Sequence, residues 1–243
     1  MRHMVKLTVY FPLETMTENA KNALIAPKIS EFVSPGIPDI FERRKYLLNA
    51  FILNVELSIT IKNRHRQLIF NMIRKVEGAF SEYCRARECV YDYIKARHES
   101  VSEYFSALRH FEHCLAHLYE AVSCMNALTR KFDGPQQFHR DDGSVLQRVH
   151  AMHTAIKHMD EYFEKGKSGD KLSFSVLSTR TGSSENLSDK DAVEIANVPM
   201  WLTDSHLECA SAAVSYKELA QEILDFCGEA EKLAIMKKRR NEK

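Results

Sequence analysis

Residues 39–131 contain no proline and only one glycine, Gly78. Proline and glycine are the residues that disfavour a helix interior most strongly, so a stretch this long without them favours helices over sheet. Apolar residues within it recur at every third or fourth position, as they do on one face of a helix: Ile69, Val76, Phe80, Tyr83, Val90 and Ile94. The chain is therefore expected to be mainly α-helical.

Capping boxes predict where further helices begin. Thr15 with Glu18 predicts a helix that ends before Pro27, and Ser100 with Glu103 predicts another. A third box, Ser144 with Gln147, precedes apolar residues in four-three spacing, which predicts one buried face: Val145, Val149, Met152, Ile156, Met159 and Phe163.

Short alternating segments predict a little sheet. Residues 5–11 alternate as a short strand would, and so do residues 172–176 and 193–198, which lie on either side of a polar, turn-rich stretch. Trp201 is expected to fill the core, and a last helix is expected to begin near Asp204. The predicted fold class is all-α, an antiparallel helical bundle with a small β-hairpin insertion before the C-terminal helix.

A domain boundary is predicted near residue 98. Residues 99–243 hold enough helices for a compact bundle, and residues 1–98 would form an N-terminal helical extension or subdomain. Glycine and proline are too scarce near this point to predict a flexible linker.

The charge balance argues against a dedicated nucleic-acid binder. The chain has 34 basic and 33 acidic residues, a net charge of +1, so any binding of a polyanion must be local. Basic residues do cluster in three stretches: Lys62, Arg64, His65 and Arg66 with Arg74 and Lys75; Arg85 and Arg87; and, in the tail, Lys237, Lys238, Arg239 and Arg240. The competing interpretation is that they form an ordinary solvated helix face.

Cysteine usage and hydropathy predict a cytoplasmic protein. The six cysteines include no C-x-x-C pair and no secretory segment accompanies them, which favours free thiols. The longest run without Asp, Glu, Lys or Arg is ten residues, 46–55, too short to cross a bilayer. No membrane association is expected.

Chemistry is indicated in one place, residues 152–161, which read MHTAIKHMDE. Together with the preceding helix that contains YFSAL at 104–108, and with the hairpin and the Leu/Ala-rich helix that follow, this motif resembles the HEPN superfamily. The resemblance covers roughly residues 100–235. It implies a helical bundle, often dimeric, that acts on RNA, in many members as a metal-independent ribonuclease.

The resemblance implies a site made of an arginine, a polar residue and a histidine four to six positions beyond the arginine. With His158 as the family histidine, His153 takes the arginine position and Thr154 the polar one. In a second register Arg148 and His153 have the family spacing, but Val149 replaces the polar residue. The candidate catalytic residues are therefore His153, His158 and Arg148.

The chemistry explains why the missing arginine matters. Cleavage of RNA without a metal needs a base for the 2′-hydroxyl, which suits histidine, and a permanent cation for the phosphate, which suits arginine. His153 and His158 are five residues apart, which places them about 140° apart around a straight helix, so a shared site would need a dimer partner.

Two functions are therefore expected from the sequence. The first is a HEPN-like, RNA-directed protein, if an enzyme then a metal-independent ribonuclease of a prokaryotic defence or toxin–antitoxin system. The second is a non-catalytic module that forms a homodimer or binds a cognate protein partner. No cofactor or metal is expected. A zinc site on His110, His113 and His117, and a Cys114–His117 nucleophile pair, lack supporting motifs.

Overall fold

The computed structural model describes residues 32–54, 62–96, 101–130, 142–159, 174–180, 192–198, 200–209 and 212–235. The strand predicted at residues 5–11, the helix predicted after Thr15 and the cap residue Ser100 lie outside these residues. The same is true of Phe163, the last member of the predicted apolar face.

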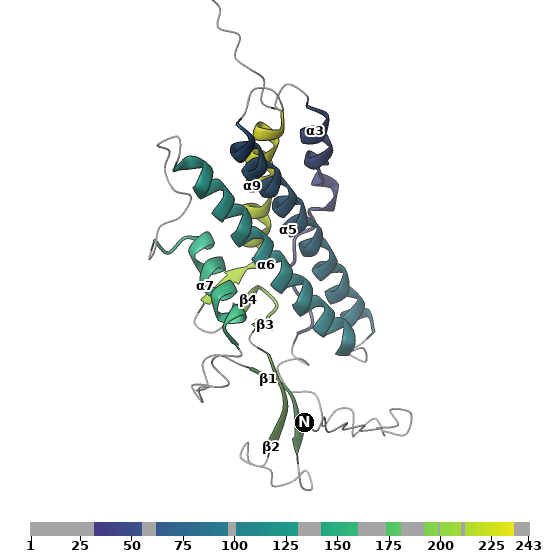
Figure 1. Ribbon diagram of the computed structural model, residues 1–243. Helices are drawn as coiled ribbons and strands as arrows, with labels where there is room; N and C mark the ends of the chain where they lie inside the picture. Colours follow the sequence, from purple (N-terminus) through teal and green to yellow (C-terminus); the bar gives the residue numbers. More distant parts are fainter. Residues whose placement is uncertain are drawn as a thin grey trace, which may run out of the picture. The chain divides into compact units, whose positions relative to one another are not determined.

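Helices make up most of the described chain (Figure 1). They are the short 3₁₀-helix η2 (Phe41–Arg43) and the α-helices α3 (Leu47–Leu53), α5 (Asn63–Lys95), α6 (Val101–Thr129), α7 (Val145–Lys157) and α9 (Tyr216–Ala234). The strands are β1 (Phe174–Arg180), β2 (Ala192–Val198), β3 (Met200–Leu202), β4 (His206–Cys209) and β5 (Ala212–Ser215). The predicted fold class, a helical bundle with a small β insertion before the last helix, is confirmed.

The chain divides into two compact units. The larger holds Phe32–Phe174 and Val198–Lys243, and the described part of the smaller is the two-stranded sheet of β1 and β2 without its end residues Phe174 and Val198. The larger unit includes residues from both sides of residue 98, and in it α5 and α6 run side by side (Figure 1). The predicted division into residues 1–98 and 99–243 stays a prediction.

The core of the larger unit lies where α5, α6 and α9 meet. Helix α5 is a single helix because its apolar residues keep one buried face over 33 residues. Side chains that are almost wholly removed from solvent include Met72 and Ile73 of α5, Leu115 and Leu118 of α6, and Ile223 of α9. Each such burial stabilises the fold by about 1.5 to 3 kcal/mol, and the core therefore fixes α5 beside α6.

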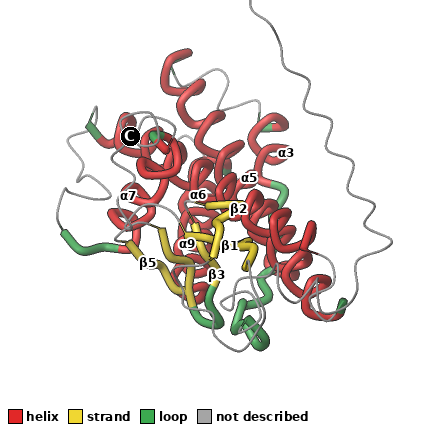
Figure 2. Tube along the Cα trace, turned by 90° about the horizontal axis from the view of Figure 1, so that it is seen from below, coloured by secondary structure: helices red, strands yellow, loops and turns green. Residues whose placement is uncertain are grey.

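The second half of the predicted last helix is correct and the first half is wrong. Instead of a helix from Asp204, the chain forms the antiparallel sheet β3–β4–β5, and α9 begins only at Tyr216. Ser215 and Glu218 form a complete capping box that fixes this start. Trp201 is buried in β3, as predicted. Seen end-on, β3 and β5 lie along one edge of the helices (Figure 2).

None of the described helices combines the length and the apolar character that crossing a bilayer requires.

Candidate functional site

Helix α7 carries the predicted motif. Its start is fixed as predicted, because the Ser144 hydroxyl accepts a hydrogen bond from the Gln147 amide at 3.1 Å. Val149 and Met152 are buried as expected, whereas Val145 and Ile156 are only half-buried. The buried face of α7 packs against α6 and β5, so the orientation of the remaining side chains is set.

Arg148 points away from the histidines of the motif, toward the start of α9. Its guanidinium donates to both carboxylate oxygens of Glu218, at 2.8 and 3.3 Å, and to the Ala213 carbonyl at 2.9 Å. A bidentate arginine–carboxylate pair is among the stronger charge-assisted contacts in proteins. Because Glu218 is also the acidic member of the α9 capping box, Arg148 joins α7 to α9 and β5.

The charge on Glu218 is well stabilised. The Arg148 guanidinium, and after it the Ser215 hydroxyl, lower the pKa of the Glu218 carboxyl from its ordinary 4.5 to about 2. The Glu218 carboxylate is therefore ionised at neutral pH. The arginine charge that a ribonuclease would offer to a phosphate is neutralised by this carboxylate.

His153 lies against α6 instead. Its ring stacks on the ring of Tyr119, with centroids 4.6 Å apart and planes inclined by 25°. The ring of His150, one turn earlier, lies against the same tyrosine, with ring centroids 5.2 Å apart. Burial, and after it the charge of Lys157, lowers the pKa of His153, so this imidazole is mainly neutral at pH 7 and is a poor substitute for a cation.

His158 follows the last residue of α7. It is the C-cap residue and its amide donates to the Thr154 carbonyl at 3.1 Å. Its ring is half-buried. Arg148 thus contacts α9 and β5, His153 contacts α6, and His158 stands at the end of the helix, so one copy of the chain does not bring the three predicted site residues into one centre.

The histidines of α6 divide between two partners on α5. His110 Nδ1 lies 2.6 Å from a Glu82 oxygen and His113 Nδ1 lies 3.8 Å from the same oxygen. His117 lies one turn away, with its Nδ1 3.4 Å from Lys75 Nζ. Within the described part of the chain, no three histidine, cysteine or carboxylate side chains are grouped so that they could hold a metal ion.

Gly78 explains how His117 fits against α5. A Cβ on Gly78 would lie 2.8 Å from His117 Cδ2 and 3.0 Å from Nε2, so only glycine admits the ring at its present position. Burial, and after it the charge of Lys75, lowers the pKa of His117. Cys114, its predicted nucleophile partner, is fully buried and its thiol pKa is raised well above the ordinary value, which opposes thiolate chemistry.

A Ser–His–Glu arrangement occurs at the turn between β3 and β4. Ser205 Oγ lies 2.7 Å from His206 Nδ1, and His206 Nε2 lies 2.6 Å from Glu208 Oε1. A hydrolase also needs donors for an oxyanion beside its serine. Here the amides of Ser205 and His206 both donate to Thr203 Oγ1, so the arrangement closes a turn.

Sequence reasoning missed the partners that decide the roles of the motif. Tyr119 precedes His153 by 34 positions and Glu218 follows Arg148 by 70. The position of Glu218 at a helix start could have been predicted, because residues 215–218 read SYKE, an S-x-x-E capping box. Nothing in the sequence pairs Tyr119 with His153.

No protein-family model, curated protein or solved structure matches this chain. The resemblance to the HEPN superfamily rests on residues 152–161 and on the order of the elements around them.

Proposed function

We propose that the chain is a HEPN-like, RNA-directed helical module that binds RNA and does not cleave it. The observation that carries the proposal is the bidentate ion pair between Arg148 and Glu218. The one arginine with the family spacing to a histidine of the motif serves the packing of α7 on α9. Because this pairing removes the cation that cleavage requires, we retain RNA binding, and not cleavage, from the HEPN-like function.

The ionisation of the motif supports the same conclusion. Metal-free cleavage needs a permanently charged group close to the base. His153 favours its neutral form and Arg148 is paired with Glu218, so neither of the two groups that stand in the family's arginine position offers an unpaired permanent charge to a base at His158. A dimer that added a cation from a second copy would make the module a ribonuclease, and this is the outcome that the experiment has to exclude.

The test is an RNA cleavage assay in EDTA with the full chain, at several protein concentrations so that any dimer is populated. The parent and the variants His153→Ala and His158→Ala are incubated with structured and single-stranded RNA, and binding is followed by fluorescence anisotropy in the same samples. We expect RNA that is bound and intact in all three. Fragments produced by the parent but not by His158→Ala would refute the proposal and favour the ribonuclease.

A second candidate, a module that binds a protein partner or a second copy of the chain, is favoured by an apolar cluster where α3 and α9 end together. Ile52, Leu53 and Ile235 are 61%, 78% and 57% exposed, and the Asn54 side chain donates to the Ala234 carbonyl at 3.0 Å, which holds the two ends side by side. Neighbouring exposed apolar residues of this size are typical of interaction sites.

The oligomeric state distinguishes this candidate. If the cluster is a homodimer interface, the double variant Ile52→Ser, Leu53→Ser elutes as a smaller species than the parent, and Val33→Ser, which changes an exposed apolar residue elsewhere, does not. Identical elution of all three proteins at every concentration would remove the homodimer interpretation of this surface.

A further inference from the structure

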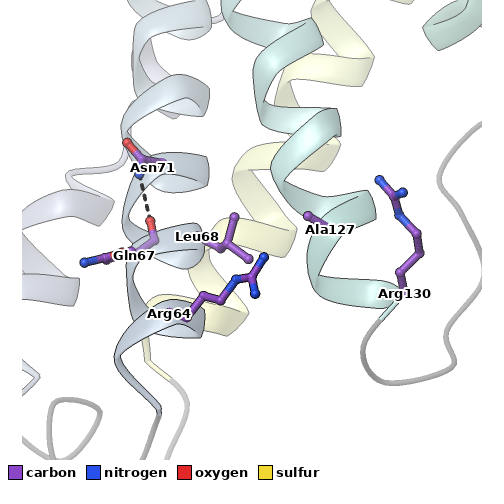
Figure 3. A pocket seen from close by; sticks show the side chains of 6 residues that line it. All are labelled: Arg64, Gln67, Leu68, Asn71, Ala127 and Arg130. Carbon is purple, nitrogen blue, oxygen red and sulfur yellow. Dashed lines mark hydrogen bonds between the residues drawn. The ribbon is translucent and has the colours of Figure 1, made fainter.

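A cavity of about 530 Å³ lies between the first turns of α5 and the last turns of α6. Its volume falls in the range of ligand sites, about 300 to 1,000 Å³. The described residues that line it are Arg64, Gln67, Leu68, Asn71, Ala127 and Arg130. In Figure 3 the Arg64 guanidinium lies between the ribbons of α5 and α6, and Arg130 stands beside the end of α6. We call this space the Arg64 cavity.

None of the described residues that line the Arg64 cavity carries a carboxylate. Among the described residues Arg64 has no ion-pair partner, and Arg130 uses its Nε to donate to the Asn126 carbonyl at 3.2 Å without pairing with an acid. Elsewhere in the same bundle arginines do form ion pairs with acidic residues: Arg87 Nη1 lies 3.1 Å from Asp39 Oδ2. Two guanidinium groups, one from α5 and one from the residue that follows α6, therefore border one cavity, and no described residue forms an ion pair with either of them.

The sequence around the cavity is unusual for a helix start. Between Glu56 and Glu77 the chain has five lysines and arginines and no acidic residue. Arg64 and Arg66 stand in the first turns of α5, where the helix macrodipole disfavours positive charge and where no acidic residue is present. Helix stability does not explain this placement, whereas an anionic ligand would.

The polar side chains form a stripe that extends past the cavity. Arg64, Gln67, Asn71 and Arg74 recur at three or four positions and so lie along one side of α5. Arg74 is exposed, and so is Lys62, the N-cap residue just before α5. A single small anion would use the cavity alone, whereas a stripe with a cation at each end and amides between them matches successive phosphates of a strand.

We propose that the Arg64 cavity and this stripe bind the phosphate groups of an RNA strand. Arg64 and Arg130 hold a phosphate from opposite sides, as the planar guanidinium does well, and Gln67 supplies an amide donor. These contacts are to the sugar–phosphate backbone of the RNA, so they do not depend on the base sequence of the strand. The assignment of the strand as RNA rests on the proposed function. The inference that the site binds phosphate groups is independent of it.

The experiment compares two variants that alter exposed arginines of the full chain. In the double variant Arg64→Gln, Arg130→Gln both guanidiniums of the cavity are removed. Arg109→Gln is the matched control, because Arg109 is exposed on α6, has no ion pair with a described residue, and lies about 30 Å along that helix from Arg130 at 1.5 Å per residue. Thermal unfolding checks that all proteins remain folded.

Affinity for a fluorescent single-stranded RNA is measured by anisotropy. We expect about tenfold weaker binding for the double variant, since each lost phosphate contact removes part of the counterion-release free energy, and unchanged binding for Arg109→Gln. Inorganic phosphate and a mononucleotide compete in parallel. If either displaces RNA at concentrations comparable with the RNA itself, the cavity is a small-anion site and the strand assignment is wrong.

Two further outcomes separate this inference from the proposed function. If the parent binds RNA and the double variant binds it equally well, the RNA uses another surface: the cavity assignment fails and the proposed function stands. If the parent binds no RNA, both fail.

Discussion

Helix α7 and the first half of α5 each present an arginine to the outside of the bundle core, and the two arginines have opposite surroundings. Arg148 is held by Glu218 and the Ala213 carbonyl. Arg64 borders a cavity whose described lining residues include no acid. Arg148, which the sequence motif singles out, is thus engaged in structural contacts, whereas Arg64, which belongs to no motif, forms no ion pair with a described residue.

The comparison shows that residue type does not assign a role. A cation that already has a buried or half-buried carboxylate partner is costly to redirect, because a ligand would have to replace that partner. A cation without a partner has no such cost. The availability of the charge is therefore a better guide to an anion site than spacing between arginine and histidine.

The largest difference between α7 and the Arg64 cavity is expected in how much their apolar side chains contribute to the free energy of unfolding. Met152 is fully buried in α7, so Met152→Ala should lower the free energy of unfolding by about 3 kcal/mol. Leu68, half-buried at the Arg64 cavity, should lose only about 1 kcal/mol in Leu68→Ala. Urea denaturation measures both. Equal losses would mean that the cavity wall is as structural as α7.

The arginines themselves give the next largest effect. Arg148→Ala leaves Glu218 without its main partner, and because the Glu218 side chain is 41% exposed, screening keeps the loss to about 1 kcal/mol. That corresponds to about 2 to 4 °C in Tm for a chain of this size. Arg64→Ala should leave the Tm unchanged or raise it slightly. A fall in Tm for Arg64→Ala that matches Arg148→Ala would show that Arg64 is also structural.

The glycines test whether α5 is tightly packed beyond the cavity. Gly228→Ala, in α9 where nothing lies within 4 Å of the new Cβ, should stabilise the protein by about 0.5 to 1 kcal/mol from helix propensity. Gly78→Ala should lose this gain or become destabilising, because His117 must move away from its new methyl group. Thermal unfolding of the two variants and the parent measures both effects. Equal stabilisation by the two substitutions would show that the His117 ring does not lie against Gly78.

Acid should reveal the smallest of these effects. The pKa of Glu218 is lowered to about 2 in the folded chain, so its ion pair contributes stability above the ordinary pKa of 4.5 and loses it as the pH falls toward 2. The Tm difference between the parent and Arg148→Ala should accordingly be constant above pH 5 and shrink on acidification. A difference that does not change with pH would contradict the role of the Glu218 charge.

Much of the fold was predictable because local signals and burial agree. The long α5 follows from its apolar spacing, and the start of α7 follows from the Ser144 cap. The start of α9 was not predicted, because Leu207 and Val214 lie seven positions apart, as on one face of a helix, whereas in the structure they pair across β4 and β5. The capping box at Ser215 is the local signal that marks the true start.

The candidate site was less predictable because its roles depend on distant partners. The motif residues were identified by spacing along one helix, but Tyr119 and Glu218, which determine where His153 and Arg148 lie, come from other helices. The basic stretch beginning at Lys62 was visible in the sequence. That Arg130 joins it at one cavity depends on how α6 lies beside α5, which only the tertiary structure gives.

The salt dependence of RNA binding tests the central claim most directly. The logarithm of the binding constant is measured against the logarithm of the salt concentration for the parent, Arg64→Gln and Arg148→Gln, at a temperature where all three are folded. The account predicts that Arg64→Gln reduces the slope by about 0.7, the value for one lost phosphate contact on a single strand, and that Arg148→Gln leaves the slope unchanged. A reduced slope for Arg148→Gln with an unchanged slope for Arg64→Gln would contradict it.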